Sequence, residues 1–243
     1  MKKICLSLAL TVSVLTGMSQ AALYGTLDDV YTNFMVQSHS QFTKAILNDF
    51  MGVGGADRFM SNQWVSGGAT NYNNVTISQN YLFNYDFLGQ ELHAKWRDTT
   101  IVVNTNYVKH FFLMENIKTH HYVKSPALDP QGKFFYESIA YDDATMDSGK
   151  VQLLRLRTVK QLRANKNDYL ANFNGDYTDK YDNKIEYFIV FPDNTSTKVK
   201  FSKSSISDAL SAKYKDKVTS FFKQPTGSFN EDVAAALIRY INQ

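Results

Sequence analysis

Cysteine is almost absent from this chain, because the single one, Cys5, lies in the N-terminal stretch MKKICLSLALTVSVLTGMSQA. In that stretch Lys2 and Lys3 precede an apolar run, and small residues follow at Ser19 and Ala21, which is the layout of a cleavable secretory signal. We expect cleavage after Ala21. The exported chain then contains no thiol, which excludes disulfide bridges, a cysteine nucleophile and a thiolate metal site.

Long apolar runs are also missing beyond the signal. A transmembrane helix needs about 20 consecutive apolar residues, and no later segment approaches that length. We therefore expect an exported protein that does not span a membrane. Its expected location is the periplasm, the periphery of an outer membrane or the outside of the cell.

Several catalytic signatures are absent as well. The chain has no GxSxG nucleophile turn, no GxxxxGK[ST] or GxGxxG phosphate loop and no HExxH zinc motif. We therefore predict no cofactor and favour a non-catalytic protein over an enzyme. Hydrolysis by paired carboxylates stays open as the alternative, because glutamates lie on or beside predicted strands and their separation cannot be derived from sequence. These glutamates are Glu91, Glu115, Glu137 and Glu186.

Neither sign of charge dominates, since 26 basic side chains stand against 23 acidic ones. Residues 150–223 nevertheless carry 15 basic and 8 acidic side chains, an excess of seven. Such an excess favours an anionic partner, for example lipid head groups, lipopolysaccharide or glycans of an envelope surface, although a solvated surface is the plainer interpretation. A protein partner also stays open. We expect no nucleic-acid partner, because the chain is exported and Arg155 and Arg157 share a strand face with Leu153 and Val159, as at the edge of a sheet.

Aromatic residues are abundant and regularly spaced in NYLFNYDFLGQELHAKW. Side chains of a strand alternate between its two faces, so aromatic residues at every second position line one face, which we predict to be buried. These residues are Tyr81, Phe83, Tyr85 and Phe87. After a turn at Gly89, the same alternation predicts a buried face with Leu92 and a solvated face with Glu91, His93 and Lys95.

The pattern of the whole chain predicts an α+β fold. We expect a signal peptide over 1–21, an N-terminal helical segment over 22–58, an antiparallel β-meander over 59–202 and two C-terminal amphipathic helices within 203–243. The β region has a possible division into two subdomains at 142–149. Within the last region, the residue Asn230 is predicted to cap the final helix.

Three of the five histidines lie in HFFLMENIKTHHYVK. A four-residue turn at ENIK places His121 opposite Phe112 and diagonal to His110, whereas His120 points away. Neutral imidazoles bind Zn²⁺ when further ligands join them, for which His93 or a carboxylate is available. His110 and His121 are therefore our candidate metal ligands, and surface histidines in a hairpin are the plainer interpretation.

Four stretches carry a resemblance to a known group. NYLFNYDFLGQEL, TTIVVNTNYVKHFFLM, GKFFYESIAY and EDVAAALIRYINQ are similar in pattern and order to a broad group of uncharacterised secreted or envelope proteins of Bacteroidota. The resemblance implies a location in the cell envelope or outside the cell, and it implies no activity and no site residues. The function that we expect is that of a non-catalytic binding or interaction module, and the alternative is an envelope hydrolase.

Overall fold

The computed structural model describes residues 58–97, 99–141, 149–162 and 180–243. The predicted signal, almost all of the predicted N-terminal helical segment and the loop at 142–148 lie outside these ranges. The described part is an α+β fold of two antiparallel sheets and two C-terminal helices. Within the described residues, no helix has the length and the apolar composition needed to cross a bilayer.

The larger sheet contains eight strands in the order β11-β10-β9-β8-β7-β6-β1-β2. Their bounds are as follows: β1 Ser66–Asn71, β2 Thr76–Ile77, β6 Val108–Glu115, β7 Lys118–Val123, β8 Tyr136–Ser138, β9 Gln152–Leu162, β10 Lys180–Val190 and β11 Ser196–Val199. All its pairs are antiparallel. Strands β8 and β9 flank the loop at 142–148 and pair directly, so the sheet continues across it.

The smaller sheet contains three strands in the order β3-β4-β5, with bounds Leu82–Asp86, Glu91–Trp96 and Thr99–Val103. A short 3-10 helix, η1 (Thr105–Tyr107), leads from β5 into β6. The segment 58–65, which precedes β1, runs along the free edge of β3. There Val65 and Phe83 exchange backbone hydrogen bonds of 3.0 and 2.7 Å, so this segment connects the two sheets.

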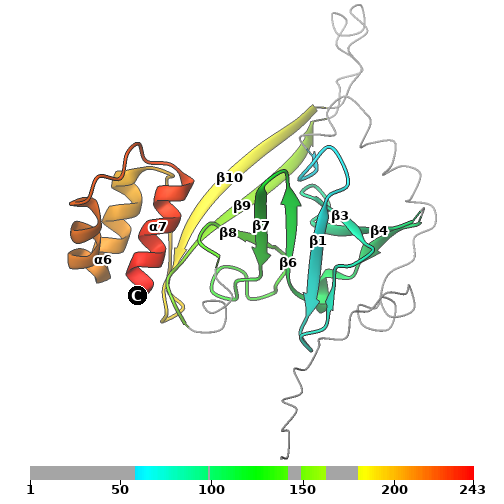
Figure 1. Cartoon of the computed structure of the whole chain (residues 1–243), viewed down its shortest axis with the longest axis horizontal. Coiled ribbons are helices and arrows are strands. Elements are labelled where there is room, and N and C mark those ends of the chain that lie inside the picture. Colours follow the sequence, from blue (N-terminus) through cyan, green and yellow to red (C-terminus); the bar gives the residue numbers. More distant parts are fainter. Residues whose placement is uncertain (1–57, 98, 142–148, 163–179) are drawn as a thin grey trace, which may run out of the picture.

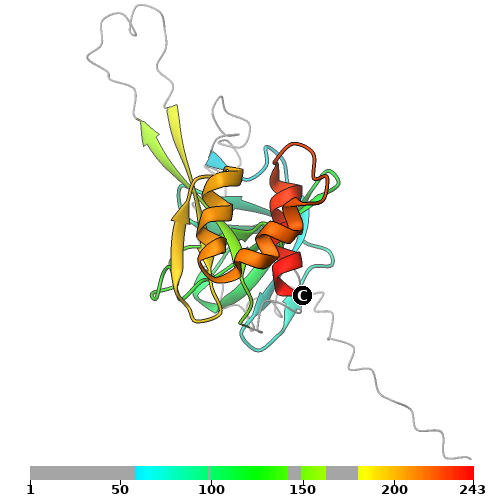
Figure 2. The same ribbon diagram turned by 90° about the vertical axis from the view of Figure 1, so that its left-hand side faces the viewer.

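The two helices lie together beside β10 at one end of the molecule (Figure 1), and the view turned by 90° shows them in front of the sheets (Figure 2). They are α6 (Lys203–Phe222) and α7 (Glu231–Asn242). The side chain of Ser202 caps α6, and Oδ1 of Asn230 accepts a hydrogen bond of 2.9 Å from the backbone N–H of Val233. The predicted cap at Asn230 is therefore confirmed.

Two layers share one face of the large sheet, which we call the inner face. At the β1–β7 end, the smaller sheet covers it and forms an aromatic core. The predicted aromatic row lies in this core, and Phe83 and Tyr85 are completely buried, as the alternation predicts. At the β9–β11 end, the two helices cover Leu153 and Ile189 and form a second core.

The opposite face of the large sheet carries a third, smaller cluster. Val123, Leu154 and Leu156 pack there, together with Leu128 and Phe134 of the connection between β7 and β8. Both faces of β8 and β9 are therefore covered over much of their length. Strand β9 pairs with β10 along its length but with β8 only at Leu154 and Arg155, so the prediction of a sheet edge is wrong at Arg155, whereas Arg157 lies beyond the pairing with β8.

Candidate functional site

A polar row crosses the inner face between the two cores. Direct cross-strand pairs join Tyr122 of β7 to Glu137 of β8, Glu137 to Arg155 of β9, and Arg155 to Tyr187 of β10. Tyr122 belongs to the aromatic core, and Tyr187 packs against the core under the helices. Glu137 and Arg155 therefore lie on the inner face between the two cores.

Glu137 is the centre of a buried hydrogen-bond network. Its Oε1 lies 2.8 Å from Nδ1 of His120, and its Oε2 accepts bonds of 2.9 and 2.5 Å from Nε and Nη2 of Arg155. The carboxylate side chain is only 8% exposed. Since an ionised carboxylate only accepts hydrogen bonds, Nδ1 of His120 carries a proton and donates it to Glu137.

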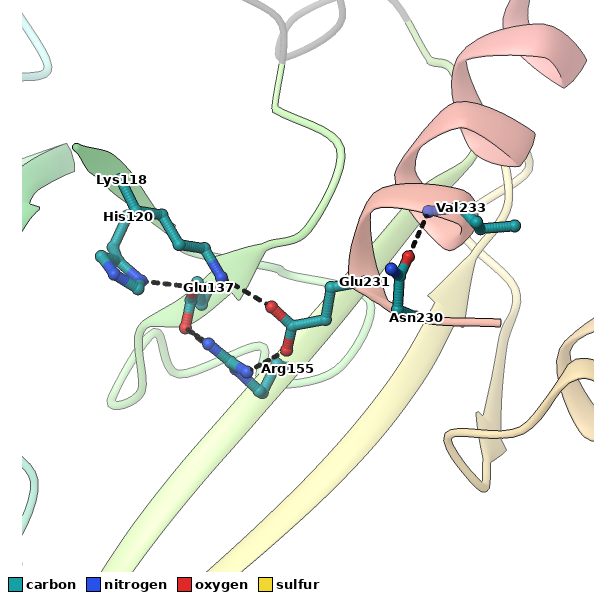
Figure 3. Close-up of polar contacts among 7 residues, drawn as sticks. All are labelled: Lys118, His120, Glu137, Arg155, Asn230, Glu231 and Val233. Carbon is teal, nitrogen blue, oxygen red and sulfur yellow. Dashed lines mark hydrogen bonds and ion pairs between the residues drawn. The ribbon is translucent and has the colours of Figure 1, made fainter. Parts of the chain in front are cut away.

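The network continues to the first turn of α7. The guanidinium of Arg155 also pairs with Glu231, the first residue of that helix, and Nζ of Lys118 lies 2.7 Å from the other oxygen of Glu231 (Figure 3). Figure 3 shows Asn230 beside Glu231, capping the same turn. Side chains of β7, β8 and β9 are thereby joined to the N-terminus of a helix.

The surroundings of the network favour the charged forms of Glu137 and Arg155 and the neutral form of Tyr122. Burial alone raises the pKa of Glu137, but the hydrogen bond from His120 and the charge of Arg155 outweigh burial and hold that pKa below its ordinary value. Burial likewise acts to lower the pKa of Arg155, and Glu137 and Glu231 reverse the effect, so that the pKa is raised. Burial raises the pKa of the Tyr122 phenol well above its ordinary value, so the phenol stays protonated.

A cavity of about 180 Å³ opens beside the network, and we call it the His120 pocket. Its polar lining consists of Glu115, His120, Tyr122, Glu137, Arg155 and Arg157. Its apolar lining consists of Met60, Phe87 and Ile185. The pocket thus combines charged groups from several strands with apolar walls, as ligand-binding sites commonly do.

Arg157 contributes the second guanidinium of the pocket. Its central carbon lies 4.4 Å from the centre of the Phe87 ring, and its Nε donates a bond of 2.9 Å to Oδ1 of Asn183. Both contacts orient the side chain, and a cation over a ring face is itself a favourable arrangement. Arg155 and Arg157 are two residues apart on β9 and so present two cations on the same side of the strand.

The candidate metal ligands His110 and His121 lie on the opposite face of the β6–β7 hairpin. Phe112 pairs with His121 and Glu115 with Lys118, which is the register that the ENIK turn predicts. The ring of His121 stacks on Tyr141, with the ring centres 3.6 Å apart. A metal site at His110 and His121 stays a prediction.

Among the described residues, the group of three side chains that can converge on one metal ion is Asp86, Glu91 and His93, on the smaller sheet. Arg58 donates to both oxygens of Asp86, with the shortest bond at 2.6 Å, and the ring nitrogen Nε2 of His93 lies 3.1 Å from Glu91. Because Arg58 already neutralises Asp86 and the side chain of Glu91 is 41% exposed, we assign no metal to this group.

The predicted solvated face of β4 is exposed only in part: Glu91 and Lys95 are partly exposed, whereas the prediction is wrong for His93. His93 is completely buried, and so are Asn84 and Asp86 on the same face. The segment 58–65 covers this face: the side chain of Asn84 bonds to its backbone, and Phe59 packs edge-on against the His93 ring at 6.1 Å. Alternation alone does not show that a neighbouring segment will cover a polar face.

The structure separates the four strand-borne glutamates. Glu115 and Glu137 line the same pocket, whereas Glu91 lies on the smaller sheet. Glu186 lies on β10 and pairs with Lys184 and Lys198, away from the inner face. Of the four carboxylates considered for hydrolysis, only Glu115 and Glu137 lie in the same pocket.

The sequence did not predict that Glu137 would bond to both His120 and Arg155. One signal was available, because the charged Arg155 lies among Leu153, Leu154 and Leu156, which are buried residues of β9. No protein-family model matches the chain, and its comparison with curated proteins and with solved structures gives no significant match either.

Proposed function

We propose that the protein is an exported, non-catalytic binding module that holds an anionic group of its ligand in the His120 pocket. The carrying observation is the convergence of Arg155, Arg157 and the protonated Tyr122 phenol on one cavity. Guanidinium groups suit carboxylates and phosphates because their N–H donors match the geometry of two oxygens. Export is supported by the signal-like N-terminus and by the resemblance to secreted proteins of Bacteroidota.

The size of the pocket supports recognition of one group instead of a whole ligand. Sites for drug-sized molecules have volumes of roughly 300–1,000 Å³, and the His120 pocket has about 180 Å³. The rest of the ligand then lies on the surrounding surface, where Ile185 is 52% exposed. Anionic glycans and lipid head groups of a cell envelope present charged groups of this kind.

Hydrolysis by paired carboxylates is the second candidate, and the shared location of Glu115 and Glu137 favours it. Such hydrolysis needs one carboxyl group that is protonated and able to donate. Glu137 is the poorer choice for that role, since His120 and Arg155 keep it ionised. Release of reducing ends from an anionic polysaccharide, abolished by Glu115→Gln, is the result that would favour hydrolysis over binding.

Retention of the protein on immobilised alginate, a polyanionic polysaccharide, tests the binding function, and immobilised dextran, which is neutral, is the reference matrix. We expect retention on alginate alone, weakening as salt rises because ions screen the attraction. Vesicles with anionic or neutral head groups form the second arm. Arg157→Gln is expected to reduce retention in whichever arm binds.

Lys160→Gln is the matched control. Lys160 lies on the same strand but on its opposite face, so both variants remove one positive charge from β9. Equal losses for the two variants, or no retention in either arm, contradict the proposed function.

A further inference from the structure

Two exposed tyrosines lie next to each other at one end of the large sheet. Tyr72 directly follows β1 and is 58% exposed, and Tyr107 directly precedes β6 and is 41% exposed. The last pair of the β1–β6 ladder is Asn71 with Val108, so the two tyrosines are neighbours just beyond that ladder. Single exposed apolar residues are common on protein surfaces, whereas two adjacent exposed rings form a patch.

Lys124 links the two segments that carry these rings. Its Nζ donates a hydrogen bond of 2.7 Å to the carbonyl oxygen of Thr105 in η1, and it lies over the Tyr72 ring at 5.8 Å from the ring centre. A cation over a ring face is a favourable arrangement. The turn after β1 and the η1 segment therefore lie side by side, and the Tyr72 ring has a support beneath it.

Both segments are shaped by their own asparagine side chains. Oδ1 of Asn71 accepts hydrogen bonds of 2.9 Å from the backbone N–H groups of Asn73 and Val75. In η1, Oδ1 of Asn104 accepts a bond of 3.1 Å from the backbone N–H of Asn106. Side-chain bonds of this kind fix a turn locally, and a surface that is shaped before binding loses less conformational entropy when a ligand arrives.

Unused polar groups surround the two rings. Asn73, Asn74 and Asn106 are exposed, and among the described residues their side-chain amides form no hydrogen bond. The same is true of the hydroxyl groups of Tyr72 and Tyr107. Amides and hydroxyls can both donate and accept, and neither 71–77 nor 104–108 contains a charged residue. A ligand that suits these groups is uncharged and rich in hydroxyls.

We propose that Tyr72 and Tyr107, with the amides around them, form a platform that binds a neutral chain of flat, β-linked sugars, as in cellulose or xylan. The equatorial hydroxyls of such sugars point sideways to the amides, and the axial C–H groups leave an apolar face that lies on an aromatic ring. Tyrosine and asparagine supply this combination of rigid apolar area and adaptable hydrogen bonding at recognition surfaces.

A glycan suits the platform better than a protein does. A protein interface of standard size takes about 20–30 residues from each partner, and the platform consists of two turns. The platform lies at the start of β6, whereas Glu115 of the His120 pocket is the last residue of that strand. The inference is therefore independent of the proposed function.

Titration calorimetry of the full exported chain with cellohexaose, xylohexaose and isomaltohexaose tests the proposal. The first two are flat, β-linked chains, whereas isomaltohexaose is a glucose hexamer with the flexible α-links of dextran. We expect heat from cellohexaose, xylohexaose or both, and none from isomaltohexaose. Added salt should leave this binding unchanged, because no ionic contact is screened.

The ring variants identify the surface that binds. Tyr72→Ala and Tyr107→Ala are each expected to weaken binding by about tenfold, since each removes one of the two stacking rings, whereas Tyr72→Phe keeps the ring and most of the affinity. Ile117→Ala is the matched control. Ile117 is fully exposed in the turn between β6 and β7, so its loss removes an exposed apolar side chain at the other end of β6.

Three results overturn the inference: no heat from either β-linked hexamer, undiminished binding in both alanine variants of the tyrosines, or equally strong binding of isomaltohexaose. Circular dichroism checks that the variants fold, as expected for substitutions of exposed side chains. Arg157→Gln, which changes the His120 pocket, should leave the binding of these hexamers unaltered. Failure of the platform and failure of the proposed function are thus separate outcomes.

Discussion

Arg155 of β9 and Glu231 of α7 form an ion pair that joins the middle of the large sheet to the first turn of the last helix. Glu231 lies 76 residues beyond Arg155 in sequence, and the pair is partly buried. The same carboxylate accepts from Lys118 and lies at the positive end of the helix dipole. Three favourable interactions therefore meet on one side chain.

Glu231→Gln is expected to lower the free energy of unfolding by about 1–2 kcal/mol, because a hydrogen bond to a charged group and a favourable helix-dipole interaction are lost together. Urea unfolding followed by circular dichroism measures the change. Asp232→Asn is the control: Asp232 lies in the same helical turn but is exposed, so its loss is about 0.5 kcal/mol or less. Equal effects of the two substitutions contradict a specific role for the Arg155 pair.

Glu137→Gln is expected to destabilise the fold by about 3 kcal/mol, because Arg155 and His120 lose a buried charged partner. The folded-state pKa of Glu137 lies below the ordinary value of 4.5, so the ionised form stabilises the fold above that pH. This stabilisation is lost as the pH falls through the lower, folded-state pKa. Unfolding free energies measured from pH 7 downward should therefore converge for wild type and variant below pH 4.5, and a constant difference contradicts the assignment.

Tyr85 is the best probe of the aromatic core. Its ring lies within 5.0–6.3 Å of Phe87, Phe111, Tyr122 and Phe135, and its hydroxyl donates to Gln90 at 2.9 Å. Tyr85→Ala is expected to cost about 3–5 kcal/mol through the cavity that it leaves, whereas Tyr85→Phe costs about 1 kcal/mol for one hydrogen bond. Leu82→Ala on the same strand is the exposed control, and its effect on urea unfolding should be small.

Asn84 holds the segment 58–65 on the smaller sheet. Its side chain donates to the carbonyl oxygens of Ser61 and Gln63 at 2.7 and 3.2 Å, and it accepts from the backbone N–H of Ser61. Asn84→Ala leaves the buried backbone groups of Ser61 without these partners, at a cost of about 1–3 kcal/mol. We expect faster amide hydrogen exchange at Ser61 and Gln63, with β9 and β10 unaffected. Unchanged exchange in this segment is the contrary result.

Local patterns in the sequence were sufficient to predict much of the fold. The alternation of Tyr81, Phe83 and Tyr85 predicts their burial, and the ENIK turn predicts the pairing of Phe112 with His121. Both predictions concern residues close together in the chain, where side-chain period and turn length fix the geometry.

The candidate site was beyond such reasoning. His120 is 17 residues from Glu137, and Glu137 is 18 from Arg155, so their contact depends on which strands become neighbours. The sequence does indicate that His120 points away from His121, which is correct, but not what it meets on the other face. Strand order is a property of the whole sheet, and the alternation within one strand carries no information about it.

Strands β9 and β10 run as one long ribbon past all three clusters of buried side chains (Figure 1). Leu153 packs under the helices, Leu154 on the opposite face and Val159 in the aromatic core. A fragment that stops before α6 would keep this ribbon and leave Leu153 and Ile189 open to water, so it should aggregate instead of folding as an autonomous β unit. The same continuity means that heat should melt the helices and both sheets in a single cooperative transition.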